Sequence, residues 1–210
     1  RYAENHYNGV NCGIMDQFAS AMGRKGCAVF LDTFSLEYSY APLPLEDETL
    51  LIVNSMVKHN LASSGYNDRR IECERALNDL QKIKDIQNLC EIKPDEFEKI
   101  KSNIKNETDM RRARHVIYEN QRTKEAKEAL DKKDMDKFGA LMNASHISLR
   151  DDFEVSCKEM DLLQHLALEM PGVYGSRMTG GGFGGCTVNL IKREFEKEFI
   201  EHRSEEHTSE

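Results

Sequence analysis

A glycine-rich stretch holds the residues whose spacing comes nearest to a ligand-binding loop. In SRMTGGGFGGCTVNLI, residues 176–191, Gly180, Gly182 and Gly185 fit the G-x-G-x-x-G spacing of dinucleotide loops. Such a loop needs a helix after the glycines, because the helix N-terminus holds the pyrophosphate. The segment CTVNLI that follows alternates and contains β-branched residues, which predicts a strand. We therefore expect a glycine turn whose backbone closely approaches other backbone or a ligand.

A second candidate group is the carboxylate of Asp16. In NCGIMDQFAS, Asp16 falls in the first turn of a helix that the chain enters through Gly13. The helix dipole favours a carboxylate there by about 0.3–1 kcal/mol, and Gly13 lets a ligand approach the backbone. The residues alone leave open whether Asp16 does chemistry or is an ordinary acid at the start of a helix.

A third candidate is Tyr66, in KHNLASSGYNDRR. Small residues precede the tyrosine, and Arg69 and Arg70 follow it, which is typical of a loop that leads into a helix. Tyr66 could stack on a ring or donate a hydrogen bond. The alternative is a half-buried tyrosine beside solvated arginines.

Composition excludes several classes of protein. The chain has 210 residues and a formal net charge of −8, from 29 basic and 37 acidic residues, which argues against nucleic acid as a partner. No apolar run approaches the ~18 residues of a membrane span, and no signal peptide opens the chain. The six cysteines are widely spaced without a C-x-x-C pair. We therefore expect reduced thiols and a cytoplasmic protein, with no disulfide framework or zinc site.

Hydrophobic patterning predicts an α+β chain in which the helices are grouped. A capping box of Ser156 and Glu159 predicts the start of one helix. The last two strands, on either side of the glycine turn, are expected to form a hairpin. Strands are expected at residues 27–32, 36–44, 49–55, 172–178 and 186–191. Helices are expected from about Cys12, from Pro94, and over residues 67–83, 110–134, 135–153 and 157–170.

Five segments together resemble one family. They are VNCGIMDQFAS, SSGYNDRR, RRARHVIYENQR, SHISLRDDFEVSC and GSRMTGGGFGGCTV. In this order they are similar to the galactokinases, members of the GHMP small-molecule kinases, and the resemblance runs from Arg1 to about Ile191. Several separate matches in one order are far more specific than a single glycine loop. The resemblance implies a GHMP-kinase-like α+β fold, with the end of an N-terminal domain followed by a ferredoxin-like C-terminal domain.

The resemblance also implies a role for each candidate residue. Asp16 matches the catalytic aspartate beside the C1 hydroxyl of the sugar, and Gly13 and Tyr66 match sugar-contacting positions. Glu4, in AENHY, matches the acidic ligand of Mg²⁺. The segment MTGGGFGG matches the third motif of the family, a turn that in relatives packs beside the phosphate loop and the sugar site. Its candidate residues are Thr179, Gly180, Gly181, Gly182, Gly184 and Gly185.

The implied reaction is transfer of a phosphoryl group from ATP, with Mg²⁺, to the C1 hydroxyl of galactose. Two alternatives share these residues. One is an N-acetylgalactosamine kinase, and the other is a galactose sensor of the same fold that has lost catalysis and binds a regulatory protein. We expect galactose and ATP as the ligands of a monomer that binds neither nucleic acid nor membrane.

Parts of the family pattern have no counterpart in the sequence. These are an N-terminal sugar-recognition segment, a catalytic arginine, the Gly/Ser-rich phosphate loop and the far C-terminal end, and Gly65 stands where relatives often have Glu. We therefore expect a fragment that is inactive alone. Residues 1–50 are expected to end the N-terminal domain, and residues 51–202 to form most of the C-terminal domain. Residues 203–210, RSEEHTSE, resemble a translated sequencing adapter and are expected to be an extended or disordered tail without a role in the fold.

Overall fold

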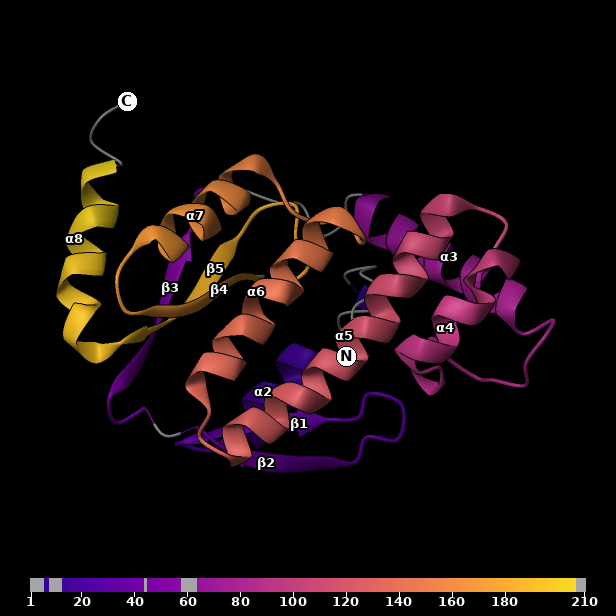
Figure 1. The fold of residues 1–210 in the computed structure, drawn as a ribbon, viewed down its shortest axis with the longest axis horizontal. Coiled ribbons are helices and arrows are strands. Elements are labelled where there is room, and N and C mark those ends of the chain that lie inside the picture. Colours follow the sequence, from indigo (N-terminus) through magenta and orange to yellow (C-terminus); the bar gives the residue numbers. More distant parts are fainter. Residues whose placement is uncertain (1–5, 8–12, 44, 58–63, 207–210) are drawn as a thin grey trace.

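A computed structural model of the chain describes residues 6–7, 13–43, 45–57 and 64–206 (Figure 1). Glu4 therefore lies outside the described residues, and so do Cys12 and the loop before α3. The strands are β1 (Cys27–Leu31), β2 (Tyr38–Pro42), β3 (Glu48–Asn54), β4 (Val173–Thr179) and β5 (Cys186–Lys192). The α-helices are α2 (Met15–Met22), α3 (Ser64–Leu80), α4 (Pro94–Ile100), α5 (Glu107–Asp131), α6 (Met135–Asp151), α7 (Lys158–Glu169) and α8 (Glu196–Glu206).

The strands form two separate antiparallel sheets. β1 and β2 make a two-stranded ribbon, and the other sheet has the order β3–β5–β4. Along the chain the elements of the larger sheet follow the order strand, helices, strand, strand, helix, which is the first part of a ferredoxin-like pattern. The predicted hairpin of the last two strands is confirmed, because β4 pairs with β5 from Val173 to Thr179.

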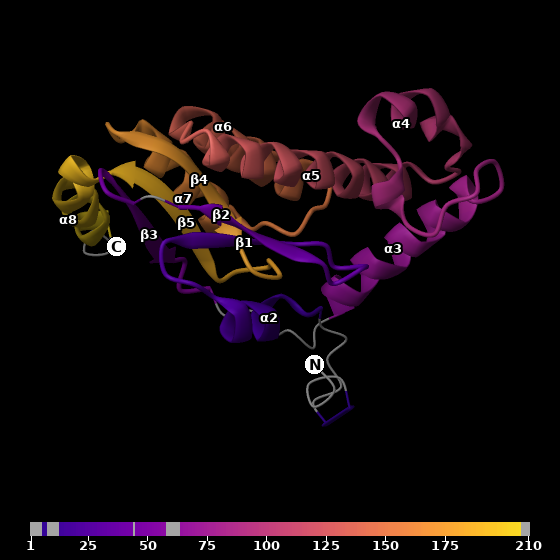
Figure 2. The ribbon, with the colours of Figure 1, turned by 90° about the horizontal axis from the view of Figure 1, so that it is seen from below.

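Helices α6 and α7 pack on the larger sheet, and α5 lies beside α6 (Figure 1). Figure 2 shows the β1–β2 ribbon between α5 and α2. The Tyr40 hydroxyl of β2 donates a hydrogen bond to the carbonyl oxygen of Met22 at 2.8 Å, and the ring of Phe18 packs edge-on against Tyr38. These contacts hold α2, which carries Asp16, against the ribbon.

One hydrophobic core lies where α3, α4 and α5 meet, at the other end of the molecule from α8 (Figure 1). Phe97 of α4 and Leu80 of α3 are fully buried there. Within the described ranges, no helix is long and apolar enough to cross a membrane.

Helix α6 lies along the free edge of β4, and three residues on one of its faces make the contact. The backbone N–H groups of Ser176 and Met178 point away from β5, and each donates to a side chain of α6. Asn143 Oδ1 accepts from Ser176 at 2.8 Å, and His146 Nδ1 accepts from Met178 at 3.1 Å. Gly139 lies one turn earlier on the same face. Unpaired edge groups of the strand are thereby satisfied inside the protein.

Gly139 permits the closest approach of α6 to β4. A Cβ built at Gly139 would lie 2.3 Å from the carbonyl oxygen of Tyr174, and a Cβ built at Gly175 would lie 2.3 Å from the carbonyl oxygen of Gly139. Both distances are too short for a carbon atom. The two glycines therefore set how closely the helix and the strand can pack.

Two predictions about local structure are wrong. Ser156 does not begin a capping box, because Cys157 is the N-cap of α7 and makes no side-chain cap bond. Ser156 Oγ instead donates to Asp161 Oδ1 at 2.5 Å. Residues 203–206 are not extended, because they continue α8 to Glu206. Adding residues to an existing helix costs far less than starting one. Residues 207–210 lie outside the described part.

We predict that Gly139→Ala lowers the free energy of unfolding by about 1–3 kcal/mol, because the added methyl overpacks the contact with β4. The higher helix propensity of Ala opposes this loss by at most about 1 kcal/mol. The matched control is Gly13→Ala, which adds the same methyl where nothing lies within 4 Å and should change stability by less than about 0.5 kcal/mol. Urea unfolding measures both, and equal effects would contradict close packing at Gly139.

Candidate functional site

Asp16 lies in the first turn of α2, as the sequence predicts, and its side chain is exposed. A Cβ built at Gly13, just before the helix, would meet nothing within 4 Å. Gly13 is therefore not required for packing, and the space beside it is open. The contacts of α2 with the β1–β2 ribbon fix the direction in which Asp16 points.

The glycine turn joins β4 to β5 and contains an unusual run of backbone conformations. The φ angle is positive at Gly180 (+85°) and then at four successive residues, Gly182 (+87°), Phe183 (+61°), Gly184 (+128°) and Gly185 (+95°). Side chains with a Cβ rarely adopt these angles, so the turn needs its glycines for the path of the chain itself.

The second half of the turn packs on other backbone. A Cβ at Gly182 would lie 2.3 Å from the carbonyl oxygen of Val155, which also accepts a hydrogen bond from the Phe183 N–H at 2.6 Å. A Cβ at Gly184 would lie 2.6 Å from the carbonyl oxygen of Val57. A Cβ at Gly180, in contrast, would meet nothing within 4 Å. The open part of the turn is therefore at Gly180.

The turn meets the start of α3, which carries Tyr66. The ring of Phe183 covers Gly65, because a Cβ there would lie 2.7 Å from Cζ of that ring. Tyr66 follows in the first turn of α3 and is half-buried. The structure thus brings together two of the three motifs. Figure 2 shows α2 on the same face of the molecule as the N-terminal end of α3, but no contact joins Asp16 to Tyr66 among those described.

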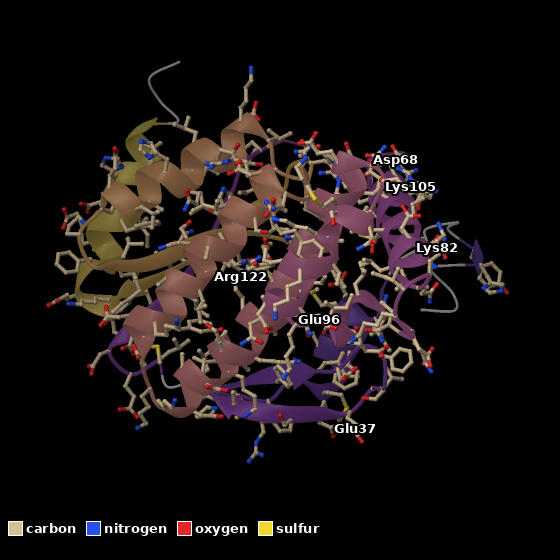
Figure 3. The ribbon with its side chains drawn as sticks, turned by 45° about the vertical axis from the view of Figure 1, so that its right-hand side comes forward. Glu37, Asp68, Lys82, Glu96, Lys105 and Arg122 are labelled. Atoms are coloured by element: carbon tan, nitrogen blue, oxygen red, sulfur yellow. The ribbon has the colours of Figure 1, made fainter. Side chains whose placement is uncertain are left out.

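Charged side chains on α5 and β4 surround Glu119. This carboxylate accepts hydrogen bonds from Ser145 Oγ and from Arg122 Nε, and Arg177 Nη1 lies 3.5 Å away. Burial opposes ionisation, but the bond from Ser145 and the charge of Arg177 hold the pKa of Glu119 below its ordinary value. Figure 3 places Arg122 near the middle of the molecule, far from the edge where Glu37 lies. The ion pair with Glu119 of α5 therefore fixes the position of Arg177, two residues before Thr179.

Two buried histidines lie beside the base of the turn. His146 accepts the Met178 N–H at Nδ1, so its Nε2 carries the hydrogen and faces Asp161 Oδ1 at 3.2 Å. The His115 ring stacks on Phe153 with 4.4 Å between ring centroids. Burial lowers the pKa of His146, and it lowers the pKa of His115 from 6.5 to about 4, although the charge of Glu119 opposes the latter shift.

The described residues contain no group of three or more His, Cys, Asp or Glu side chains placed to hold a metal ion. The predicted Mg²⁺ ligand, Glu4, is outside them, so the role of Glu4 stays a prediction. Five cysteines are described, and all are free thiols.

Comparison with known proteins gives the same family as the motifs. Residues 126–207 match the family described as GHMP kinases C terminal. Galactokinase from Clostridium acetobutylicum is 55% identical over 199 residues, which are 95% of this chain and 51% of that protein. Galactokinase from Bacillus subtilis is 49% identical over 96% of this chain and 52% of that protein. The chain thus spans about half the length of the relatives it matches.

A solved structure is also similar to this chain. The crystal structure of Lactococcus lactis galactokinase complexed with galactose superposes with a TM-score of 0.91, at 43% identity, over 94% of this chain and 51% of that chain. Residues 126–207 thus match a GHMP kinase C-terminal domain, and nearly the whole chain is similar to galactokinases. The expected α+β fold is thereby confirmed.

Several residues that position the candidate site were not predicted from the sequence. Asn143 and His146 bind the edge of β4, and Arg112 binds the loop before α7. Phe183 joins the turn to α3. No signal singled out Arg112, because it is one of three arginines in RRARHVI. The face of α6 gave no such signal, because glycine and asparagine there do not form an apolar stripe.

We predict a clear difference in stability between Gly182→Ala and Gly180→Ala. Both residues have nearly the same positive φ, so each substitution should cost about 1–2 kcal/mol of backbone strain. Only Gly182→Ala drives its methyl into the Val155 carbonyl, which should cost about 1–3 kcal/mol more. Urea unfolding of the two variants tests this difference, and equal losses would show that Gly182 is not held against Val155.

We predict that stability falls as the pH is lowered from about 6.5 to 4. In this range the unfolded chain protonates His115 and the folded chain does not, so the stabilisation present above pH 6.5 is lost, up to about 3 kcal/mol. His115→Gln should reduce this slope. The residual slope should come from His146 and, near pH 4, from carboxylates such as Glu119, because their pKa values are also lowered. The control His165→Gln removes an exposed histidine of α7. A slope that His115→Gln leaves unchanged would contradict the burial of a neutral ring.

Proposed function

We propose that this chain takes part in the ATP-dependent phosphorylation of galactose at its C1 hydroxyl. The observation that carries the proposal is the similarity to galactokinases over 95% of the chain, together with the 0.91 TM-score to a galactokinase that was solved with galactose. The motif residues support it, because the turn and Tyr66 come together, and because α2, which carries the exposed Asp16, lies on the same face of the molecule as the start of α3 (Figure 2).

In this proposal Asp16 orients the C1 hydroxyl and accepts its proton. Phosphoryl transfer needs little covalent help from the protein, and most of the catalytic effect comes from positioning and from electrostatic stabilisation. A carboxylate at a helix N-terminus interacts favourably with the helix dipole, and it can serve as the group that accepts the proton. Gly13 leaves the open space in which the sugar approaches, and Tyr66 contributes an aromatic surface and a hydroxyl group.

ATP would approach the open part of the glycine turn. Gly180 has no neighbour within 4 Å of its missing Cβ, whereas Gly182 and Gly184 face protein backbone. The turn therefore fits a ligand on its Gly180 side only, through Thr179, Gly180 and Gly181. ATP supplies the phosphoryl group when bound. Mg²⁺ is also part of the proposal, but its ligands would include Glu4 and not a cluster among the described residues.

We further propose that residues 1–50 belong to one domain and residues 51–202 to a second one. The separate pairing of β1 with β2 supports this division, although β3 begins at Glu48 and α8 continues to Glu206. The free thiols among the described residues support a cytoplasmic location. We propose a monomer.

The experiment uses a chimera in which this chain replaces the matching half of the Clostridium acetobutylicum galactokinase. We expect the chimera to convert galactose and ATP to galactose 1-phosphate and ADP. A folded chimera that binds both substrates without forming the sugar phosphate would overturn the proposal.

We predict that Asp16→Asn in the chimera lowers kcat by about 10²–10⁴-fold, because the amide cannot accept the proton of the hydroxyl group. Galactose affinity should change much less, since an amide still forms hydrogen bonds, so the loss should fall on kcat. The matched control is Asp95→Asn, which changes another exposed acid at the same position in a helix, α4. If Asp16→Asn retains kcat at saturating galactose, Asp16 is not the base.

A further inference from the structure

The loop of residues 152–155, between α6 and α7, is held by one buried arginine. Arg112 of α5 has a side chain that is 2% exposed. Its Nη1 donates to the Asp152 carbonyl oxygen and its Nη2 to Glu154 Oε2, both at 2.6 Å. The side chain therefore binds the loop at two points, one on the backbone and one on a carboxylate.

The same guanidinium also binds α3. Arg112 Nε donates to Glu72 Oε2 at 2.6 Å. Arg69, on the same carboxylate, donates its Nη2 to the carbonyl oxygen of Glu154 at 3.1 Å. Arg69 lies three residues after Tyr66, which is about one turn of helix, so the two side chains share a face of α3. The loop and the turn of α3 that carries Tyr66 are thus tied to each other.

The loop in turn supports the glycine turn. Glu154 has a positive φ of +53°, a strained conformation for a residue with a side chain, which its surroundings must hold in place. The next residue, Val155, accepts the Phe183 N–H and lies against Gly182. A shift of the loop would therefore move the backbone of the turn, because the contact at Gly182 leaves no free space.

We propose that Arg112 is a positioning residue that fixes the glycine turn relative to Tyr66. The inference rests on the proposed function, in which Tyr66 contacts the sugar and the turn contacts ATP. Arg112 touches neither ligand in this proposal. It acts through residues 152–155 on one side and through Glu72 on the other, so that the two binding surfaces keep one spacing.

An arginine is suited to this role because its planar group donates in several fixed directions at once. Lysine keeps the charge but cannot reproduce the three directions of Nε, Nη1 and Nη2. The chain offers a matched control in Arg75, which donates to both carboxylate oxygens of Asp109 at 2.8 and 2.6 Å. This pair also joins α3 to α5, but both of its bonds end on α5.

The first test measures hydrogen–deuterium exchange of the chain itself by mass spectrometry. In Arg112→Lys, peptides that cover residues 152–155 and 179–185 should exchange about tenfold faster, because the loop opens more often. In Arg75→Lys these peptides should exchange at the parental rate. Equal acceleration in both variants, or no acceleration in Arg112→Lys, would overturn the proposal. This test does not depend on kinase activity.

The second test measures kinetics in the chimera, with rates normalised to folded protein. Arg112→Lys should lower kcat by about 10–100-fold, while the KM values for galactose and ATP change by less than about threefold. Arg75→Lys should keep the parental kcat. Loss of folded protein with a parental kcat would mean that Arg112 is only structural, and would overturn the proposal. An inactive parent chimera would count against the proposed function and not against the exchange result.

A second variant applies if Arg112→Lys does not fold. Glu154→Gln keeps the shape of a side chain that is 41% exposed and weakens its bonds to Arg112 and to Arg111. It should accelerate exchange at residues 179–185 and lower kcat, both by a smaller factor than Arg112→Lys does. Parental exchange and parental kcat in Glu154→Gln would contradict a role for the loop in holding the turn.

Discussion

The contact of α6 with the free edge of β4 is the constraint on which the candidate site depends. Gly139 allows the two backbones to approach, and Asn143 and His146 then accept the outward N–H groups of Ser176 and Met178. Glycine permits the short distance and the two side chains make it favourable, because buried N–H groups need partners. This contact fixes β4 along its length up to Thr179, and so it fixes where the glycine turn begins.

The turn itself divides into a structural part and an open part. From Gly182 to Gly185 the positive φ angles and the short distances to Val155 and Val57 serve the packing of the protein. Gly180 has the same kind of φ without a neighbour. A glycine-rich motif can therefore contain glycines that packing requires and glycines that leave space for a ligand. The atoms around the position where a Cβ would lie distinguish the two kinds.

Much of the fold could be predicted from the sequence, because the apolar run CAVFL and the alternation in CTVNLI are local signals of strands. The strand after the glycine turn, which excluded a dinucleotide loop, is confirmed as β5. The apolar residues Phe138, Leu141 and Met142 indicate a core-facing side of α6 in the sequence. The face with Gly139, Asn143 and His146 gives no such signal, because its partners on β4 are more than thirty residues away. Ser156 precedes the N-cap of α7, and its hydroxyl binds the carboxylate of Asp161 in the first turn of that helix and not a backbone N–H group.

The glycine turn, Asp16 and Tyr66 stand out by residue type and spacing, the family resemblance implies their roles, and the structure adds how they are held. Asp16 is placed by α2 and the ribbon, Tyr66 by α3, and the turn by β4 and by the loop that Arg112 binds. The central claim is that Asp16 faces the reacting hydroxyl of the sugar. The most direct measurement is a crystal structure of the chimera with galactose. The account predicts the Asp16 carboxylate within hydrogen-bonding distance of the C1 hydroxyl and Tyr66 in contact with the sugar. Galactose bound with its C1 hydroxyl out of reach of Asp16 would contradict it.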